Sequence, residues 1–287
     1  MVTRRDYTAE AAEACKAVLI ELIHLMGEFR NHMVVVGGWV PALLFPKAQE
    51  PHVGTLDIDL ALDFRQIPDD SYRTILQALS ARGYRQDPAQ QFRFFREVKV
   101  SGREPVVVEI DLLAGEYGGT GPGHRTQPIQ DARARKARGC DLVFSEPVQV
   151  SLEGELPGGG RDRVRFYVAG IVPWLVMKGM ALADRLKEKD AYDIYYCVRF
   201  YPNGPSGLAE AFRSYLDNRL VREGVEKIRR QFLSVDDAGP KWVADFLDVQ
   251  DQEERAITQR RAYETIRAWL DQLEIGSWQG EEDWSET

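Results

Sequence analysis

The sequence predicts an α+β protein, with a mixed sheet and flanking helices followed by a helical carboxyl-terminal domain. Two observations support this prediction. Strand-like apolar segments and helical apolar spacing alternate through the first 169 residues. From residue 170 onward the apolar spacing is helical almost throughout. We therefore expect two domains, residues 1–169 and residues 170–287.

The elements of the first domain follow from their periodicity and from the residues that punctuate them. Apolar residues from Thr8 to Arg30 recur at helical steps, a short helix is expected over Trp39 to Phe45, and another over Ser71 to Arg82 after the candidate caps Asp69 and Asp70. The expected strands are Met33 to Val36, Leu56 to Leu62, Phe92 to Val100, Val106 to Leu113, Leu142 to Leu152 and Arg163 to Ala169.

Glycines and prolines gather between Gly115 and His124, which predicts a loop that is either mobile or ordered by a ligand. The second domain opens at Pro173, a residue suited to the first turn of a helix. Further helices are expected over Ala191 to Val198, Leu208 to Leu216, Val221 to Phe232 and Glu253 to Leu273, before an acidic tail.

Composition excludes several classes of protein. No run of apolar residues has the length of a membrane span, and the amino terminus lacks the apolar core of a signal peptide, so we expect a cytoplasmic protein. The three isolated cysteines have no zinc-ligand spacing and are expected to be reduced and buried. A net charge of −8 over 287 residues argues against non-specific nucleic-acid binding.

Two local clusters of basic residues remain as candidate phosphate-binding surfaces, with a solvated charged face as the alternative. They comprise Arg82, Arg85, Arg93, Arg96, Lys99 and Arg103, and Arg125, Arg133, Arg135, Lys136 and Arg138.

Carboxylates interrupt two of the apolar strands. Asp57 and Asp59 point to the same face of one strand, because alternate residues share a face, and Glu109 and Asp111 do so on another. Like charges this close are tolerated at a solvated strand end or around a divalent cation. If the two strands are neighbours, three carboxylates come together, a set of hard oxygen ligands that suits Mg²⁺ and phosphoryl or nucleotidyl transfer.

A glycine pair, Gly37 and Gly38, precedes the first acidic strand. Glycine lets the backbone approach a phosphate closely, and the short helix that follows would direct its positive amino end toward the anion. The alternative is that the turn between strand and helix needs glycine for steric reasons alone.

These residues, in this order, resemble the nucleotidyltransferase superfamily of the polymerase β type, which carries a glycine pair before a D-x-D strand and a third acidic residue on a later strand. The matching segments are "GGWVPALLFPKAQEPHVGTLDIDLAL" and "VEIDLL". A third segment, "PWLVMKGMALADRLKEKDAYDIYYCV", is similar to a helical motif of the AbiEii-type toxins, a group that includes the MenT enzymes. Trp39 and the pair Thr55-Leu56 depart from the common pattern.

The resemblance implies a Mg²⁺-dependent nucleotidyltransferase of the EC 2.7.7 type, with a nucleoside triphosphate (NTP) as donor and the tRNA 3′ end as the first expected acceptor. It also implies a toxin with a cognate antitoxin. The alternatives are nucleotidylation of a protein or an aminoglycoside-like small molecule, and an inactive nucleotide-binding module.

The resemblance also implies roles for individual residues. Gly37, Gly38 and Thr55 would contact the nucleotide phosphates, Lys178 and Arg185 would meet the triphosphate, and Asp190 or Asp193 would orient the acceptor or act as base. Asp57, Asp59 and Asp111 would bind Mg²⁺, with Glu109 as the competitor for the third position. An ion pair between Lys189 and Asp193 that only stabilises a helix is the alternative for the helical motif.

Overall fold

The structure is a computed structural model that describes residues 3–63, 66, 69–99, 104–114, 126–129 and 132–273. The chain divides into two compact units, one from Arg5 to Trp174 and the other from Leu175 onward together with the first four residues. The division falls within helix α4 (Ile171–Arg185), and the boundary expected after residue 169 stays a prediction.

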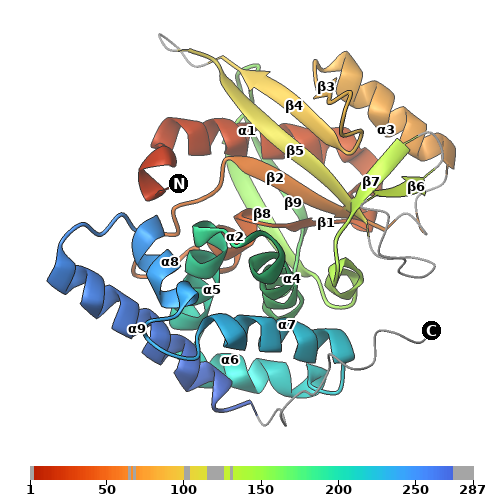
Figure 1. Cartoon of the computed structure of the whole chain (residues 1–287). Coiled ribbons are helices and arrows are strands. Elements are labelled where there is room, and N and C mark those ends of the chain that lie inside the picture. The colour runs from red at the N-terminus through yellow and green to blue at the C-terminus, as the bar shows by residue number, and fades with distance from the viewer. Residues whose placement is uncertain are drawn as a thin grey trace. The chain divides into compact units, whose positions relative to one another are not determined.

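The first unit, the sheet unit, is built on a mixed sheet (Figure 1). Along its main path the strand order is β3-β4-β5-β2-β1-β9-β8, and the β6–β7 hairpin pairs with β5 through β7. The strands are β1 (Met33–Val36), β2 (Asp57–Leu62), β3 (Arg85–Gln86), β4 (Arg93–Val98), β5 (Val106–Ala114), β6 (Thr126–Ile129), β7 (Ala132–Lys136), β8 (Val148–Glu155) and β9 (Arg161–Val168).

The strand register places the acidic residues in one cluster. β2 runs parallel to β5, with Asp57 opposite Glu109 and Asp59 opposite Asp111. Residues opposite each other on paired strands share a face of the sheet, so all four carboxylates lie on one face. The prediction that the two acidic strands are neighbours is confirmed.

The other face of the sheet packs on helix α1 (Ala9–Met26), which crosses the sheet in Figure 1. Ile58 and Leu60 of β2 and Ile110 and Leu112 of β5 alternate with the acidic residues and belong to this apolar core. The core fixes the register, because a slip by one residue would bury the carboxylates against α1. The Thr8 hydroxyl caps α1 by accepting a hydrogen bond from the Ala11 amide at 3.2 Å.

The structure differs from the sequence prediction at several elements. The strand expected over Leu142 to Leu152 is partly a 3-10 helix (Cys140–Phe144), and β8 begins only after Pro147, which has no amide hydrogen for strand pairing. Helix α3 (Asp69–Ala81) starts at Asp69, one of its two candidate caps. Strands β3, β6 and β7 were not predicted, and the loop from Gly115 to His124 lies outside the described residues.

The second unit, the helical unit, confirms the helical prediction. Trp269 packs edge-on against Phe212, with ring centroids 5.1 Å apart, and both side chains are fully buried. Helix α8 was not predicted, because it is short and contains Gly239 and Pro240. The helices after α4 are α5 (Glu188–Phe200), α6 (Gly204–Phe212), α7 (Arg219–Gln231), α8 (Ala238–Phe246) and α9 (Gln252–Leu270).

In the part of the chain that the structure describes, we find no helix with the length and apolar character required to cross a bilayer.

A buried charge of α1 provides a test of the packing in the sheet unit. Glu21 accepts hydrogen bonds from Tyr84 Oη at 2.9 Å and from Arg96 Nε at 2.9 Å, and it is only 7% exposed. Glu21→Ala leaves Arg96 without this carboxylate, and we expect a loss of about 3–5 kcal/mol in the free energy of unfolding, measured with urea.

Glu13→Ala on the same helix is the matched control. Glu13 is exposed and pairs with Lys16 at 3.5 Å, so its removal should cost less than about 1 kcal/mol. Equal effects of the two substitutions would contradict the structural role of the Glu21 network.

Candidate active site

The glycine pair packs directly against the acidic strand. An added Cβ at Gly37 would lie 1.9 Å from Asp59 Oδ2, and one at Gly38 would lie 2.5 Å from Thr55 Oγ1. Gly37 also has a φ of +66°, a conformation that favours glycine. The side chains of the acidic segment therefore occupy the space that a larger residue would need, which supports the steric explanation of the glycine pair. Contact of the turn with phosphate stays a prediction.

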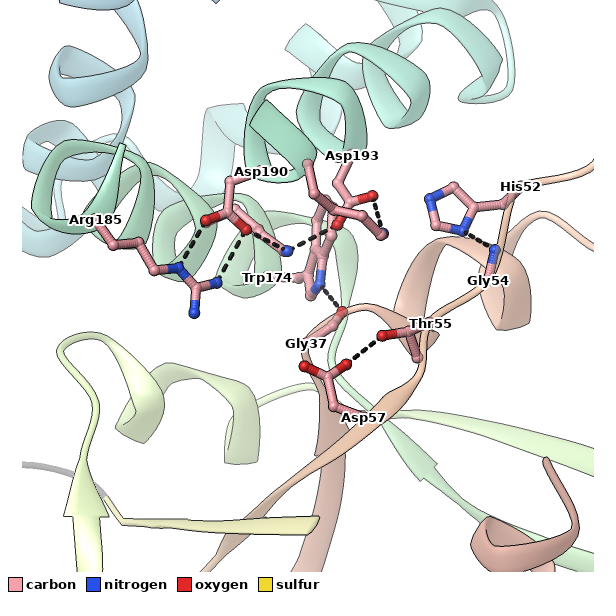
Figure 2. A network of polar contacts seen from close by, with 11 residues as sticks. Gly37, His52, Gly54, Thr55, Asp57, Trp174, Arg185, Asp190 and Asp193 are labelled. Atoms are coloured by element: carbon pink, nitrogen blue, oxygen red, sulfur yellow. Dashed lines mark hydrogen bonds and ion pairs between the residues drawn. The ribbon is translucent and has the colours of Figure 1, made fainter. Parts of the chain in front are cut away.

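Hydrogen bonds fix both the turn and the start of β2 (Figure 2). The buried Trp174 donates from Nε1 to the carbonyl oxygen of Gly37 at 2.8 Å. The hydroxyl of Thr55, which is 3% exposed, donates to a carboxylate oxygen of Asp57. His52 Nδ1 accepts from the amide of Gly54 at 3.1 Å and so orders the loop before β2. Thr55 thus orients Asp57, and its predicted contact with phosphate stays untested.

A buried thiol lies on the other side of the acidic strand. Cys15 Sγ donates to the carbonyl oxygen of Asp57 at 3.6 Å. Burial raises the pKa of the Cys15 thiol well above its ordinary value, and the charges of Asp57 and Asp59 raise it further. The thiol therefore stays protonated and unreactive. All three cysteines are free and buried, as the sequence predicts.

The four carboxylates differ in exposure and in partners. Asp57 is exposed, Asp59 is half-buried, and Asp111 is only 5% exposed. Arg93 of β4 holds Asp111 through two hydrogen bonds, Nε to Oδ1 at 2.9 Å and Nη2 to Oδ2 at 3.0 Å. Arg93 Nη2 also lies 2.8 Å from Glu109 Oε1. The hydrogen bonds to Asp111, followed by the charges of Asp111 and Glu109, raise the pKa of Arg93.

This arrangement bears on the predicted Mg²⁺ site. Asp57 and Asp59 supply hard oxygen donors on one face of one strand, which fits the ligand preference of Mg²⁺. Both oxygens of Asp111 instead accept hydrogen bonds from a cation. Within the described ranges, no three His, Cys, Asp or Glu side chains are arranged to hold a metal ion. Asp57 and Asp59 therefore fit the ligand preference of Mg²⁺, whereas the choice of a third ligand between Asp111 and Glu109 stays open.

The helical unit holds a buried charge cluster, which includes four predicted site residues, Lys178, Arg185, Asp190 and Asp193. Lys178 Nζ lies 2.7 Å from Asp190 Oδ1 and 2.8 Å from Asp193 Oδ2, and Lys178 is 6% exposed. Arg185 donates to both oxygens of Asp190, at 2.7 and 3.0 Å (Figure 2). Lys189 pairs with Asp193 at 2.6 Å, so the helix-stabilising ion pair expected from the sequence is present.

The charges of this cluster stabilise one another. Burial alone would lower the pKa of Lys178, but the carboxylates of Asp190 and Asp193 outweigh it and raise that pKa well above its ordinary value. Burial alone would raise the pKa of Asp190, but Lys178 and Arg185 outweigh it and hold that pKa below 3.8. The predicted contact of Lys178 and Arg185 with a triphosphate stays a prediction, and both cations already have carboxylate partners.

Sequence reasoning missed two contributors to the site. Arg93 was grouped with a basic surface cluster, although its position on a strand beside an acidic strand is a signal for pairing. Trp174 was given no role in the site. In the same basic cluster, Arg96 pairs with Glu21, whereas Arg82 and Arg85 are exposed. In the second cluster, the side chains of Arg125, Arg133, Arg135 and Lys136 lie outside the description.

Substituting the glycines separates contact from backbone strain. Gly37→Ala combines a positive φ with a clash against Asp59, so we expect a loss of about 2–5 kcal/mol in the free energy of unfolding. Gly38→Ala has a normal φ of −72° and only the clash with Thr55, so its loss should be smaller. Urea denaturation measures both.

Gly159→Ala in the β8–β9 turn is the matched control. Its φ is +87°, but nothing lies within 4 Å of the added Cβ, so only backbone strain of about 1–2 kcal/mol applies. If Gly37→Ala lowered the free energy of unfolding no more than Gly159→Ala does, contact with Asp59 would not be what requires glycine at position 37.

The pKa of Asp190 leads to a prediction about pH. A carboxylate whose folded pKa is lowered contributes stability above its unfolded pKa, near 3.8, and loses that contribution as the pH falls through the folded value. The difference in unfolding free energy between the wild type and Asp190→Asn should therefore be largest above about pH 5 and shrink in acid. Urea denaturation from about pH 3 to about pH 7, which spans the constant region and the acid decrease, measures it. A difference that does not change with pH would contradict the ion-pair assignment.

Comparison with protein families supports the resemblance seen in the sequence. A family model described as "Nucleotidyl transferase AbiEii toxin, Type IV TA system" matches residues 26–272. The matched range contains the glycine turn, both acidic strands and the charge cluster of the helical unit. No curated protein matches the chain. Since the match covers most of the sequence, the chain belongs to the AbiEii nucleotidyl transferase toxin family of type IV toxin–antitoxin systems.

Proposed function

We propose that this protein is a nucleotidyltransferase that moves a nucleotide from an NTP to an acceptor hydroxyl, with Mg²⁺ bound at Asp57 and Asp59. The observation that supports this most is the strand register. It places Asp57 and Asp59 beside Glu109 and Asp111 on one face of the sheet, next to a glycine turn. Such an acidic row has a charge that a divalent cation on a nucleotide would offset.

The residues of the sheet unit have distinct parts in the proposed reaction. When bound, Mg²⁺ would neutralise phosphate charge and favour the leaving of pyrophosphate. Thr55 orients the carboxylate of Asp57, and the Gly37 turn holds Asp59 in place. The apolar residues of β2 pack against α1 and hold the strand in place, so both carboxylates have fixed positions. Fixed positions are the main requirement of a reaction that depends on positioning and charge.

The chemical step is a substitution at the α-phosphorus. The acceptor oxygen forms a bond to the α-phosphorus while the bond from that phosphorus to the bridging oxygen of the β-phosphate breaks. Pyrophosphate leaves with the electron pair, and the acceptor hydroxyl gives its proton to a base. The resemblance gives Asp190 or Asp193 the role of this base or of orienting the acceptor, and the lowered pKa of Asp190 favours the orienting role for that residue. In the resemblance Lys178 and Arg185 meet the triphosphate. Within the helical unit, ion pairs hold Lys178, Arg185 and Asp190 in a fixed arrangement.

The proposed acceptor is the 3′ end of tRNA, and the proposed partner is a cognate antitoxin. The family to which the chain belongs supports an antitoxin partner, and the resemblance to the MenT enzymes supports tRNA as the acceptor. Exposed basic residues such as Arg82 and Arg85 are compatible with RNA as a substrate despite the acidic total charge.

Labelling experiments test the proposal. The wild-type protein, incubated with Mg²⁺, each labelled NTP and total RNA, should transfer label to the tRNA fraction. Asp57→Asn and Asp59→Asn should each reduce transfer by about 10³-fold or more, because each removes charge needed in the transition state. Both variants should stay folded, because the two positions are exposed or half-buried.

Glu155→Gln is the matched control, since it removes an exposed carboxylate from β8 and should leave transfer unchanged. If the label appeared in protein or in a small molecule, tRNA would be wrong as the acceptor, but the proposed nucleotidyl transfer would stand. Full activity of Asp59→Asn would refute the proposed metal site, and magnesium-dependent NTP binding without any labelled product would refute the enzymatic function.

A further inference from the structure

One basic residue, Arg93, lies beside the acidic residues Asp57, Asp59, Glu109 and Asp111 of the sheet unit, and the proposed reaction gives it no role. Arg93 lies on β4 directly opposite Asp111 of β5, in an antiparallel register that turns its side chain to the acidic face. The neighbouring Phe94 is opposite Ile110 and belongs to the core on the other face. The register that unites the carboxylates therefore also places a guanidinium among them.

The contacts of Arg93 concentrate on Asp111. Its Nε and Nη2 donate to the two carboxylate oxygens in the forked geometry that makes such pairs strong, and the same Nη2 reaches Glu109. The side chain of Asp111 is 7% exposed and that of Arg93 is 20% exposed, so water screens this pair much less than a surface pair.

A carboxylate held in this way is a poor ligand for a divalent cation. Ligation would place the metal beside the guanidinium, and the two cations would repel each other. It would also require Asp111 to give up or share the forked hydrogen bonds. Arg93 thus opposes the recruitment of Asp111 through both charge and geometry.

We infer that Arg93 is a positioning residue that withholds Asp111 from the metal and so limits the divalent-cation site to Asp57 and Asp59. This inference rests on the proposed function, because it assumes a cation at that pair. The affinity of the site for metal in the absence of nucleotide is then set by the Arg93–Asp111 pair. A nucleotide that brings its own Mg²⁺ would be favoured over the free ion, because the protein alone offers fewer carboxylates.

Binding of Mn²⁺, followed through the electron paramagnetic resonance signal of the free ion, tests this inference without any measurement of activity. Arg93→Gln should tighten Mn²⁺ binding by about tenfold or more, the scale on which neighbours of metal ligands change affinity. Arg93→Lys keeps the charge but cannot form the two forked hydrogen bonds to Asp111. Its affinity for Mn²⁺ should therefore lie between those of the wild type and Arg93→Gln.

A matched pair of second substitutions distinguishes ligation by Asp111 from a general change in charge. In the Arg93→Gln background, Asp111→Asn and Glu109→Gln each remove one negative charge from the same strand. Each also lies opposite one member of the Asp57 and Asp59 pair. We expect Asp111→Asn to abolish the gain in affinity and Glu109→Gln to keep most of it. Equal losses, or no gain in Arg93→Gln, would overturn the inference.

Folding and the proposed function are controlled separately. Circular dichroism establishes that each variant is folded. If Arg93→Gln does not fold, Arg93→Lys provides the test, and Mn²⁺ affinity unchanged from the wild type would then overturn the inference. The double variant Arg93→Gln/Asp111→Asn also removes the buried carboxylate that the single variant leaves without its guanidinium.

Asp57→Asn and Asp59→Asn should abolish Mn²⁺ binding in the wild-type background. If they do not, the proposed metal site fails, whereas an unchanged affinity in the Arg93 variants alone overturns only the role of Arg93.

Discussion

The contact between the turn at Gly37 and the carboxylate of Asp59 is the constraint on which the site of the sheet unit depends. Val36 is paired with Asp59 across β1 and β2, so the chain must turn immediately beside a charged side chain. Only a residue without a Cβ leaves room for that carboxylate. The indole Nε1 of Trp174 then fixes the turn by donating a hydrogen bond to the carbonyl oxygen of Gly37, and the apolar core beneath β2 fixes the register. The position of the acidic pair thus follows from packing on both faces of one strand.

Much of this arrangement was predictable from the sequence, because it is encoded in local patterns. Alternation of Asp57, Ile58, Asp59 and Leu60 determines which residues share a face, and a second strand with the same pattern suggested a common cluster. The position of Arg93 on a strand beside an acidic strand is a signal for pairing with a carboxylate, but local patterns do not identify which carboxylate. Its pairing with Asp111 depends on the antiparallel register of β4 and β5, which is a non-local property of the sheet. Likewise, the sequence left two explanations for the glycine pair, and the positions of Asp59 and Thr55 in the structure favour the steric one.

The two units treat buried charge in a similar way. In the sheet unit Arg93 neutralises Asp111, and in the helical unit Lys178 and Arg185 neutralise Asp190. Removing one partner of such a pair is costly, whereas the pair itself adds little stability compared with apolar packing. The proposed function would explain why these ionic groups are retained at this cost, because in it Arg93 sets the affinity for metal and Lys178 and Arg185 meet a triphosphate. It also means that the loss of activity in any variant of these residues must be judged together with its stability.

In the proposed function, the acidic pair Asp57 and Asp59 of β2 forms the metal-binding part of a nucleotidyltransferase site. The most direct test is a crystal structure of the protein soaked with Mn²⁺ and a non-hydrolysable NTP analogue, with the metal located by anomalous scattering. We expect a peak in contact with the carboxylates of both Asp57 and Asp59, with the phosphates of the analogue bound to the same ion. A well-occupied analogue with its metal away from both aspartates would contradict this account.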